Sequence, residues 1–120
     1  MSTSEISTVL AWTDALNAHD LDTLEKLSSP DIEIAQLHSA IQGRNGLHQW
    51  AQSYTGPMEV GRMYVRDGVV VVELTGGGSA SAQSAAAFRV VHDHVTSVFG
   101  HSDLQSALAA TELTESDLDA

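Results

Sequence analysis

The stretch WTDALNAHDLDTLEKLSSPDIEIAQLH, residues 12–38, decides the fold of this 120-residue chain. It begins inside an apolar stripe that repeats every three or four residues, which predicts an amphipathic helix over residues 4–18. Asp20 suits the N-cap of a second, short helix, and Pro30 ends that helix because proline lacks a backbone N–H. Polar and apolar residues then alternate over residues 31–38, which predicts a strand with one buried face. The stretch therefore predicts a helical hairpin followed by a strand.

After this strand the sequence predicts one more helix, an antiparallel meander and a final helix. Asn45 can cap the third helix, which ends before Gly56-Pro57. Four strands are expected over residues 58–66, 69–75, 83–91 and 95–100. Ser102 and Gln105 match a capping box for a last helix over residues 104–110. This order indicates an α+β fold, a cone-shaped curved mixed sheet whose concave face is covered by three N-terminal helices around an apolar pocket.

The length and composition fit one compact domain. With 42% hydrophobic residues, the chain can bury a core and leave a modest cavity. We expect a single domain over residues 1–110 and an acidic C-terminal tail over residues 111–120. Sixteen acidic and five basic residues give a formal charge of −11, which disfavours nucleic acids and anionic membranes as partners. The N-terminus lacks the basic and apolar regions of a secretory signal, and no apolar run is long enough to span a membrane, so a cytoplasmic location is expected.

Residues 9–36, the tripeptide Phe88-Arg89-Val90 and the final strand carry a family resemblance. They resemble ketosteroid isomerases and SnoaL-like polyketide cyclases, members of the nuclear transport factor 2-like superfamily. The resemblance implies a cone-shaped fold around an apolar pocket. In ketosteroid isomerases a tyrosine hydroxyl and a protonated strand aspartate hold the enolate oxygen, and another aspartate transfers the proton.

Those three roles fall here on Trp12, Ala86 and Gln36. An indole can donate only through its N–H, and alanine donates nothing. Glutamine cannot take up a proton at any relevant pH. The resemblance therefore implies the fold and the pocket, whereas isomerisation by the family mechanism is not expected.

Two other residues are candidates for acid–base catalysis. His38 follows Gln36 by two residues, so in an unbroken strand both would face the pocket, and an imidazole can act as a base near neutral pH. The alternative is a loop histidine outside the sheet. Asp103 is similar to an aspartate that follows the last strand in SnoaL-like cyclases. The alternative is a carboxylate favoured by the dipole of the final helix. Whether His101 faces the pocket or solvent is left open.

The pocket itself is expected to be lined mainly by apolar and aromatic side chains. The candidate ligand-binding residues are Trp12, Leu16, Ile34, Gln36, Trp50, Tyr54, Met58, Tyr64, Val72, Phe88 and Val90. Residues of these types more often belong to a core than to a ligand site. The six histidines show no metal-ligand spacing, so neither a metal nor another cofactor is expected. The chain has no cysteine, which excludes a disulfide framework and a thiol nucleophile.

Two hypotheses follow for the function. In the first, the chain holds or converts a hydrophobic cyclic or carbonyl compound by cofactor-free acid–base chemistry, as an isomerase, cyclase or hydrolase. In the second, it is a non-catalytic module that binds a ligand or pairs with a second copy. A homodimer through the convex face of the sheet is expected.

Overall fold

The computed structural model describes residues 3–36, 39–53, 60–74, 85–101 and 103–118. The described helices are α1 (Thr3–Asn17), α2 (Leu21–Lys26), α3 (Gly43–Ser53) and α4 (Leu104–Thr111), with a 3₁₀ turn at Glu115–Asp117. The described strands are β1 (Ser28–Gln36), β2 (Ser39–Gln42), β3 (Val60–Arg66), β4 (Val69–Leu74), β5 (Ala85–Val91) and β6 (His94–His101). The α+β class predicted from the sequence is confirmed. Within these residues no helix is both long and apolar enough to cross a bilayer.

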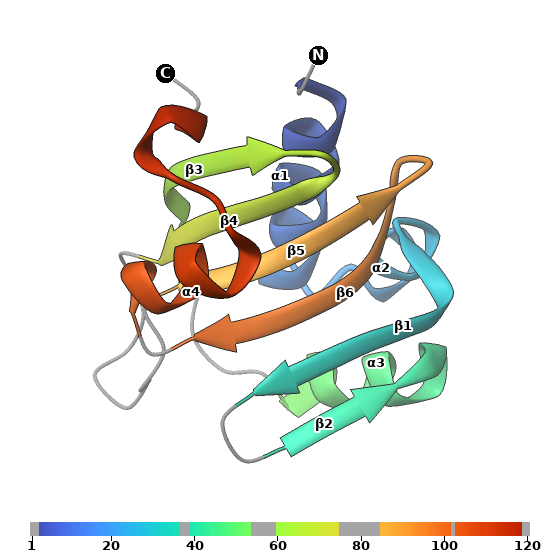
Figure 1. Ribbon diagram of the computed structural model, residues 1–120. Helices are drawn as coiled ribbons and strands as arrows, with labels where there is room; N and C mark the ends of the chain where they lie inside the picture. Colours follow the sequence, from blue (N-terminus) through green and yellow to red (C-terminus); the bar gives the residue numbers. More distant parts are fainter. Residues whose placement is uncertain (1–2, 37–38, 54–59, 75–84, 102, 119–120) are drawn as a thin grey trace.

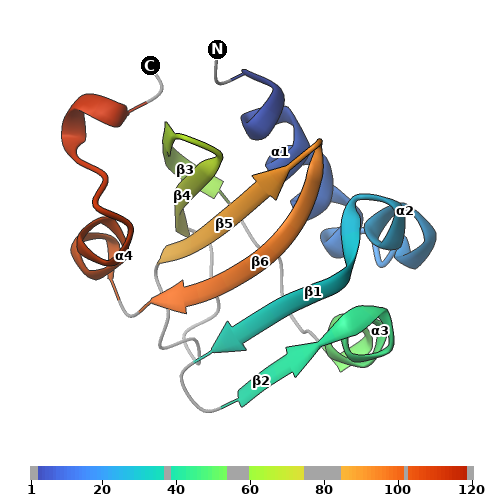
Figure 2. The same ribbon diagram turned by 45° about the vertical axis from the view of Figure 1, so that its right-hand side comes forward.

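The strands form one curved, mixed sheet in the order β2-β1-β6-β5-β4-β3. Strand β1 runs parallel to β6, and the other neighbouring strands are antiparallel. Helices α1, α2 and α3 lie on one face of the sheet, and α4 lies across β4, β5 and β6 on the other (Figures 1 and 2). We call the first of these the inner face and the second the outer face.

The helical hairpin follows the sequence prediction closely. Helix α2 begins after Asp20, whose carboxylate accepts a hydrogen bond from the Thr23 backbone N–H at 3.3 Å. Strand β1 begins at Ser28 and contains Pro30, so it starts earlier than predicted. The ladder between β1 and β6 is interrupted between Ser28 and Glu33. Proline is tolerated at this interruption because it has no backbone N–H to donate to a neighbouring strand.

Strand β2 is absent from the sequence-based prediction. It has four residues, and its pairing places Ile41 opposite Ile34 of β1. Helix α3 then begins at Gly43, before the predicted cap at Asn45. Gly43 has a φ of +82°, which glycine adopts without steric cost, and this conformation turns the chain directly from strand to helix.

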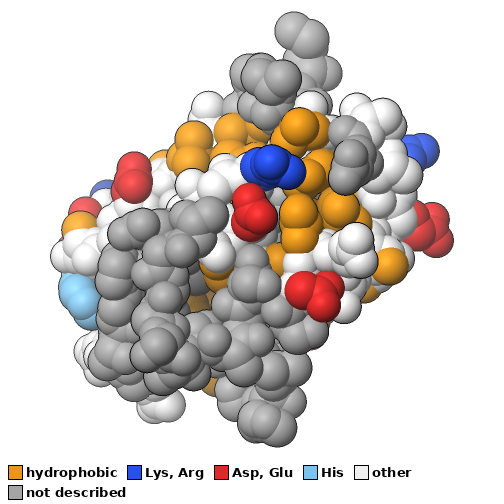
Figure 3. Space-filling model, turned by 90° about the vertical axis from the view of Figure 1, so that its left-hand side faces the viewer, with side chains coloured by type: hydrophobic (Ala, Val, Ile, Leu, Met, Phe, Trp, Pro, Cys, Tyr) orange, Lys and Arg blue, Asp and Glu red, His pale blue; other side chains and the backbone are white. Residues whose placement is uncertain are grey.

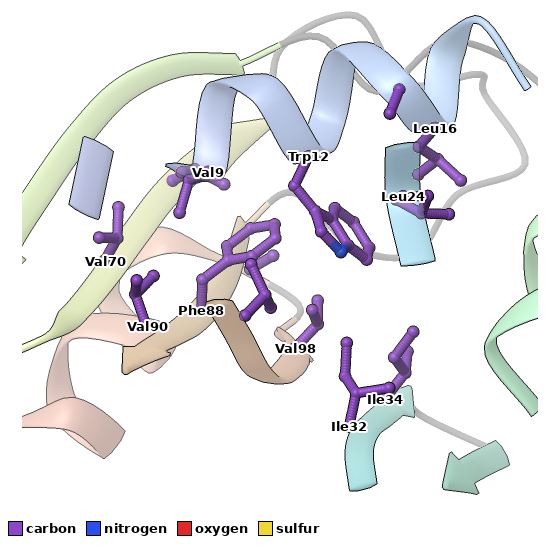
Figure 4. Close-up of a cluster of buried hydrophobic side chains, with 14 of the residues drawn as sticks. Val9, Trp12, Leu16, Leu24, Ile32, Ile34, Val70, Phe88, Val90 and Val98 are labelled. Carbon is purple, nitrogen blue, oxygen red and sulfur yellow. The ribbon is translucent and has the colours of Figure 1, made fainter. Parts of the chain in front are cut away.

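Two buried clusters flank the sheet. The larger lies between the inner face and α1–α3 and includes Trp12, Phe88 and Ile34 (Figure 4). The smaller lies between the outer face and α4 and includes Tyr64 and Leu113. Strand β4 is buried on both faces, which explains its run of valines at residues 69–72.

The final helix lies where the sequence predicts it, but its N-cap differs. Asp103, and not Ser102, is the N-cap of α4, so the predicted capping box with Gln105 is wrong. After α4 the acidic segment turns back toward the outer side of β3, where Leu118 forms a bridge with Tyr64.

On the side of the molecule seen in Figure 3, hydrophobic side chains gather around basic and acidic groups. Apolar surface therefore reaches solvent on this side.

Candidate functional site

Trp12 is at the centre of the inner cluster. Its side chain points from α1 toward the sheet and is fully buried (Figure 4). The ring stacks on Trp50 with 6.0 Å between centroids and meets Phe88 edge-on at 5.4 Å. Such aromatic contacts add to the stabilisation gained by burying the rings. The three rings join α1, α3 and β5 into one packed unit.

The indole N–H of Trp12 has a partner inside the protein. It donates to the hydroxyl oxygen of Ser28 at 2.9 Å, and that hydroxyl donates to the Leu24 carbonyl oxygen at 2.7 Å. Ser28 is fully buried. These two bonds satisfy the buried indole N–H of Trp12 and the buried hydroxyl of Ser28. The indole donor is therefore engaged by the protein and is not directed at a ligand oxygen.

Ala86 is the residue on which the sequence resemblance places the role of the protonated aspartate of ketosteroid isomerases. It is 3% exposed and lies between Val72 of β4 and Gly100 of β6 on the inner face. A methyl group at this position provides no hydrogen-bond donor. Trp12 and Ala86 together therefore offer no free donor for a developing oxyanion.

The structure brings together some of the predicted pocket residues and separates others. The inner cluster contains Trp12, Leu16, Ile34, Val72, Phe88 and Val90, and Trp50 is half-buried against it. Tyr64 belongs instead to the outer cluster, across the sheet from Trp12. The side chain of Gln36 and the residues His38, Tyr54 and Met58 lie outside the described parts of the structure. The roles of these four stay predictions.

Asp103 is an exposed helix cap. Its carboxylate accepts a hydrogen bond from the Ser106 backbone N–H at 2.7 Å. Hydrogen bonds from Ser106, chiefly from its N–H and then from its hydroxyl, hold the pKa of Asp103 below its usual value. The nearby His101 contributes a smaller lowering. An ionised carboxylate can accept a proton but cannot donate one near neutral pH, and Asp103 is therefore unsuited to act as a general acid.

We expect Asp103→Ala to lower the midpoint of thermal unfolding by a few degrees at pH 7, because α4 loses its cap. The pKa of Asp103 is lower in the folded protein than in the unfolded chain. Its negative charge therefore stabilises the folded protein at pH values above the unfolded pKa of about 3.9. This contribution is lost as the pH falls through the folded pKa. Asp103→Asn keeps the acceptor without the charge. The difference between wild type and Asp103→Asn should shrink from pH 7 to pH 3, and a constant difference would contradict the contribution of the charge, whereas an unchanged midpoint in Asp103→Ala would contradict the capping role.

His101 lies on the outer face of β6. It is the partner of Ala85, whose side chain is buried in the outer cluster. The sequence leaves its orientation open because the β5–β6 ladder is irregular between Arg89 and Val90, which breaks the simple alternation of faces. His101 is therefore separated from the Trp12 cluster by the sheet.

A cavity of about 320 Å³ lies on the outer face between the sheet and α4. It is lined by Val69, Ala87, Phe88, Arg89, Ser97, Phe99, His101, Ala110 and Thr111. We call this cavity the outer groove. The sequence-based prediction places the pocket on the inner face and does not find the groove. Among the described residues, no three histidine or carboxylate side chains converge in a way that would hold a metal ion.

A family model for the SnoaL-like domain matches residues 9–103 of the chain. The chain belongs to the SnoaL-like domain family. No curated protein is similar enough in sequence to be matched.

Solved structures that resemble this SnoaL-like chain share its fold. A nuclear transport factor 2-like protein of unknown function from Cytophaga hutchinsonii has a TM-score of 0.73 and 12% identity, with 87% of this chain and 94% of that chain covered. A candidate polyketide cyclase from Sinorhizobium meliloti has a TM-score of 0.68 and 17% identity, with 79% and 94% covered. A candidate ketosteroid isomerase from Kribbella flavida has a TM-score of 0.65 and 20% identity, with 82% and 76% covered. The nuclear transport factor 2-like fold expected for the SnoaL-like chain is thus confirmed.

Proposed function

We propose that this SnoaL-like protein binds a hydrophobic cyclic or carbonyl-bearing small molecule on its inner face, without the proton transfer of a ketosteroid isomerase. The observation that carries the proposal is the hydrogen bond from the Trp12 indole to Ser28, because it occupies the donor that would meet a ligand oxygen. Ala86 supports the same conclusion, since it replaces the second donor with a methyl group.

The composition of the inner cluster supports a hydrophobic ligand. Trp50 is half-buried at the border of the cluster, so part of its ring remains open to a molecule lying against it. Flat aromatic surfaces next to buried aliphatic side chains suit rigid ring systems, and such pockets are mostly apolar. A cyclic ketone or a polyketide is the class that the names of two similar structures suggest. The formal charge of −11 disfavours nucleic acids and anionic membrane surfaces as partners.

The first experiment is native mass spectrometry of freshly purified protein, followed by extraction of any bound compound. A co-purified hydrophobic compound would support the proposal and give its chemical class. A Δ5-3-ketosteroid should bind and quench tryptophan fluorescence, but it should not be isomerised above the background rate. Trp50→Ala should weaken this binding about tenfold, because an aromatic contact is lost. Phe99→Ala, on the outer face, is the matched control and should leave it unchanged.

Two results would overturn this function. If the wild type isomerised the ketosteroid and Gln36→Ala did not, the protein would be an enzyme. Failure to bind any cyclic ketone, in a protein that purifies empty, would favour the dimerisation module. The homodimer expected from the sequence stays a proposal, and light scattering should then give a mass near twice 12.7 kDa.

A further inference from the structure

The outer groove places a cation, an aromatic ring and an imidazole in one line. Arg89 of β5 pairs with Ser97 of β6, Ala87 pairs with Phe99, and Ala85 pairs with His101. Residues two apart along a strand face the same side and are separated by about 7 Å. Arg89 and His101 therefore stand at two ends of the groove, about 13 Å apart along the strands, with Phe99 between them.

The groove exists because small side chains of the sheet lie next to the C-terminal end of α4. Ala87 forms part of its floor, and Ala110 and Thr111 at the end of α4 form one wall. Phe99 is 42% exposed, so a large aromatic side chain is open to solvent in the groove. The volume of about 320 Å³ is within the range of small-molecule sites.

The side chains that line the groove favour an anion, although the Asp103 carboxylate lies near its His101 end. None of its nine lining residues is acidic, although the chain has 16 acidic and five basic residues. The ion pairs formed within the described parts of the chain are His48 with Glu25 and Arg66 with Asp67, and neither involves Arg89. A guanidinium group can bind a carboxylate through two parallel hydrogen bonds. Among the residues that the structure describes, Arg89 has no acidic partner, so its guanidinium can pair with an anion beside the exposed Phe99.

We propose that the outer groove binds a small organic carboxylate with an aromatic or short aliphatic body. The carboxylate would pair with Arg89, and the apolar body would lie on Phe99 and Ala87. His101 at the far end limits the ligand to about the size of one ring with a short side chain. This site is separate from the inner face and does not depend on the ligand proposed there.

A second copy of the chain fits the groove less well. The end of α4 stands along one side, so the face is not flat. A partner that covered Arg89 without a carboxylate would leave a buried charge unpaired, which is costly. The homodimer expected through the convex face would cover the groove, so a second copy is the alternative occupant that the test must exclude.

Glu33 gives the proposal an internal control. It is exposed on β1 and is the register partner of Ser97, which is in turn the partner of Arg89. Its backbone position is thus two strands from Arg89, or about 10 Å. At that separation its negative charge should oppose binding of an anion, and Glu33→Gln should strengthen it.

The test is titration with 3-phenylpropionate, compared with the uncharged 3-phenylpropanamide of nearly the same shape. Binding is followed by calorimetry and by amide chemical shifts. We expect the acid to bind and to shift amides of β5, β6 and α4, whereas the amide should bind at least about tenfold more weakly. Arg89→Gln should weaken binding of the acid by about tenfold or more, and Glu33→Gln should strengthen it a few-fold. Arg89→Lys keeps the charge and should retain part of the affinity.

Trp50→Ala is the control for the inner face and should leave binding of the acid unchanged. Equal binding of acid and amide, no effect of Arg89→Gln, or shifts confined to α1–α3 would each overturn the proposal. Light scattering is run on the same samples. A dimer that becomes monomeric in Arg89→Gln, together with no response to the acid, would show that a second copy occupies the face, and would also overturn it.

Discussion

Replacing Trp12 with alanine is expected to lower the free energy of unfolding by about 4 kcal/mol, the typical cost of removing a large buried aromatic side chain. The ring is fully buried and contacts both Trp50 and Phe88. Its loss would leave a cavity between α1 and the sheet that the surrounding side chains cannot fill. Since a domain of this size is stable by only about 5–15 kcal/mol, urea denaturation should show a much lower midpoint.

Two variants separate packing from hydrogen bonding. Trp12→Phe keeps a ring but removes the indole N–H, so we expect a smaller loss than for alanine. Ser28→Ala leaves the buried indole N–H without an acceptor and should cost about 1–3 kcal/mol. If Trp12→Ala unfolded at the wild-type urea concentration, the ring would not be the centre of the core, and the proposed inner-face site would lose its structural basis.

Local sequence signals predicted the elements whose structure is set locally. Helix α1 follows from its apolar stripe, and α2 from the Asp20 cap. Strand β2 could not be predicted because its four residues have no pattern of their own and are ordered by pairing with β1. The cap of α4 was misplaced by one residue, since Ser102 and Asp103 are both good N-cap residues.

The candidate site was less predictable because it depends on which face each residue occupies. Tyr64 and Phe99 have the residue types expected of a pocket lining, but both lie on the outer face. Irregular pairing between Val60 and Met63 obscures the alternation in β3. The outer groove arises only when α4 packs across β5 and β6, a tertiary event that leaves no pattern in the sequence of any one element.

Replacing Ala86 with aspartate is expected to destabilise the protein strongly at pH 7 and much less at pH 4. Ala86 is buried among apolar side chains of β4, β5 and β6, so an ionised carboxylate there would lose its hydration without gaining a partner. Burial would raise the pKa of the new carboxyl above its unfolded value of about 3.9. The penalty is therefore absent below that value and grows by about 1.4 kcal/mol for each pH unit up to the folded pKa, reaching about 4 kcal/mol near pH 7.

Ala86→Asn is the matched control, because it has nearly the same shape but does not titrate. The two variants should unfold at similar urea concentrations at pH 4 and diverge as the pH rises, whereas parallel behaviour would show that the position is hydrated. Ala86→Asp also tests the explanation that the chain lacks two hydrogen-bond donors for a ketosteroid oxygen. A carboxyl held neutral there would restore one donor for a ketosteroid oxygen, but the Trp12 indole would still donate to Ser28. We therefore expect no ketosteroid turnover from the folded variant at any pH, and turnover would show that Trp12 can release Ser28 and turn its N–H to a ligand.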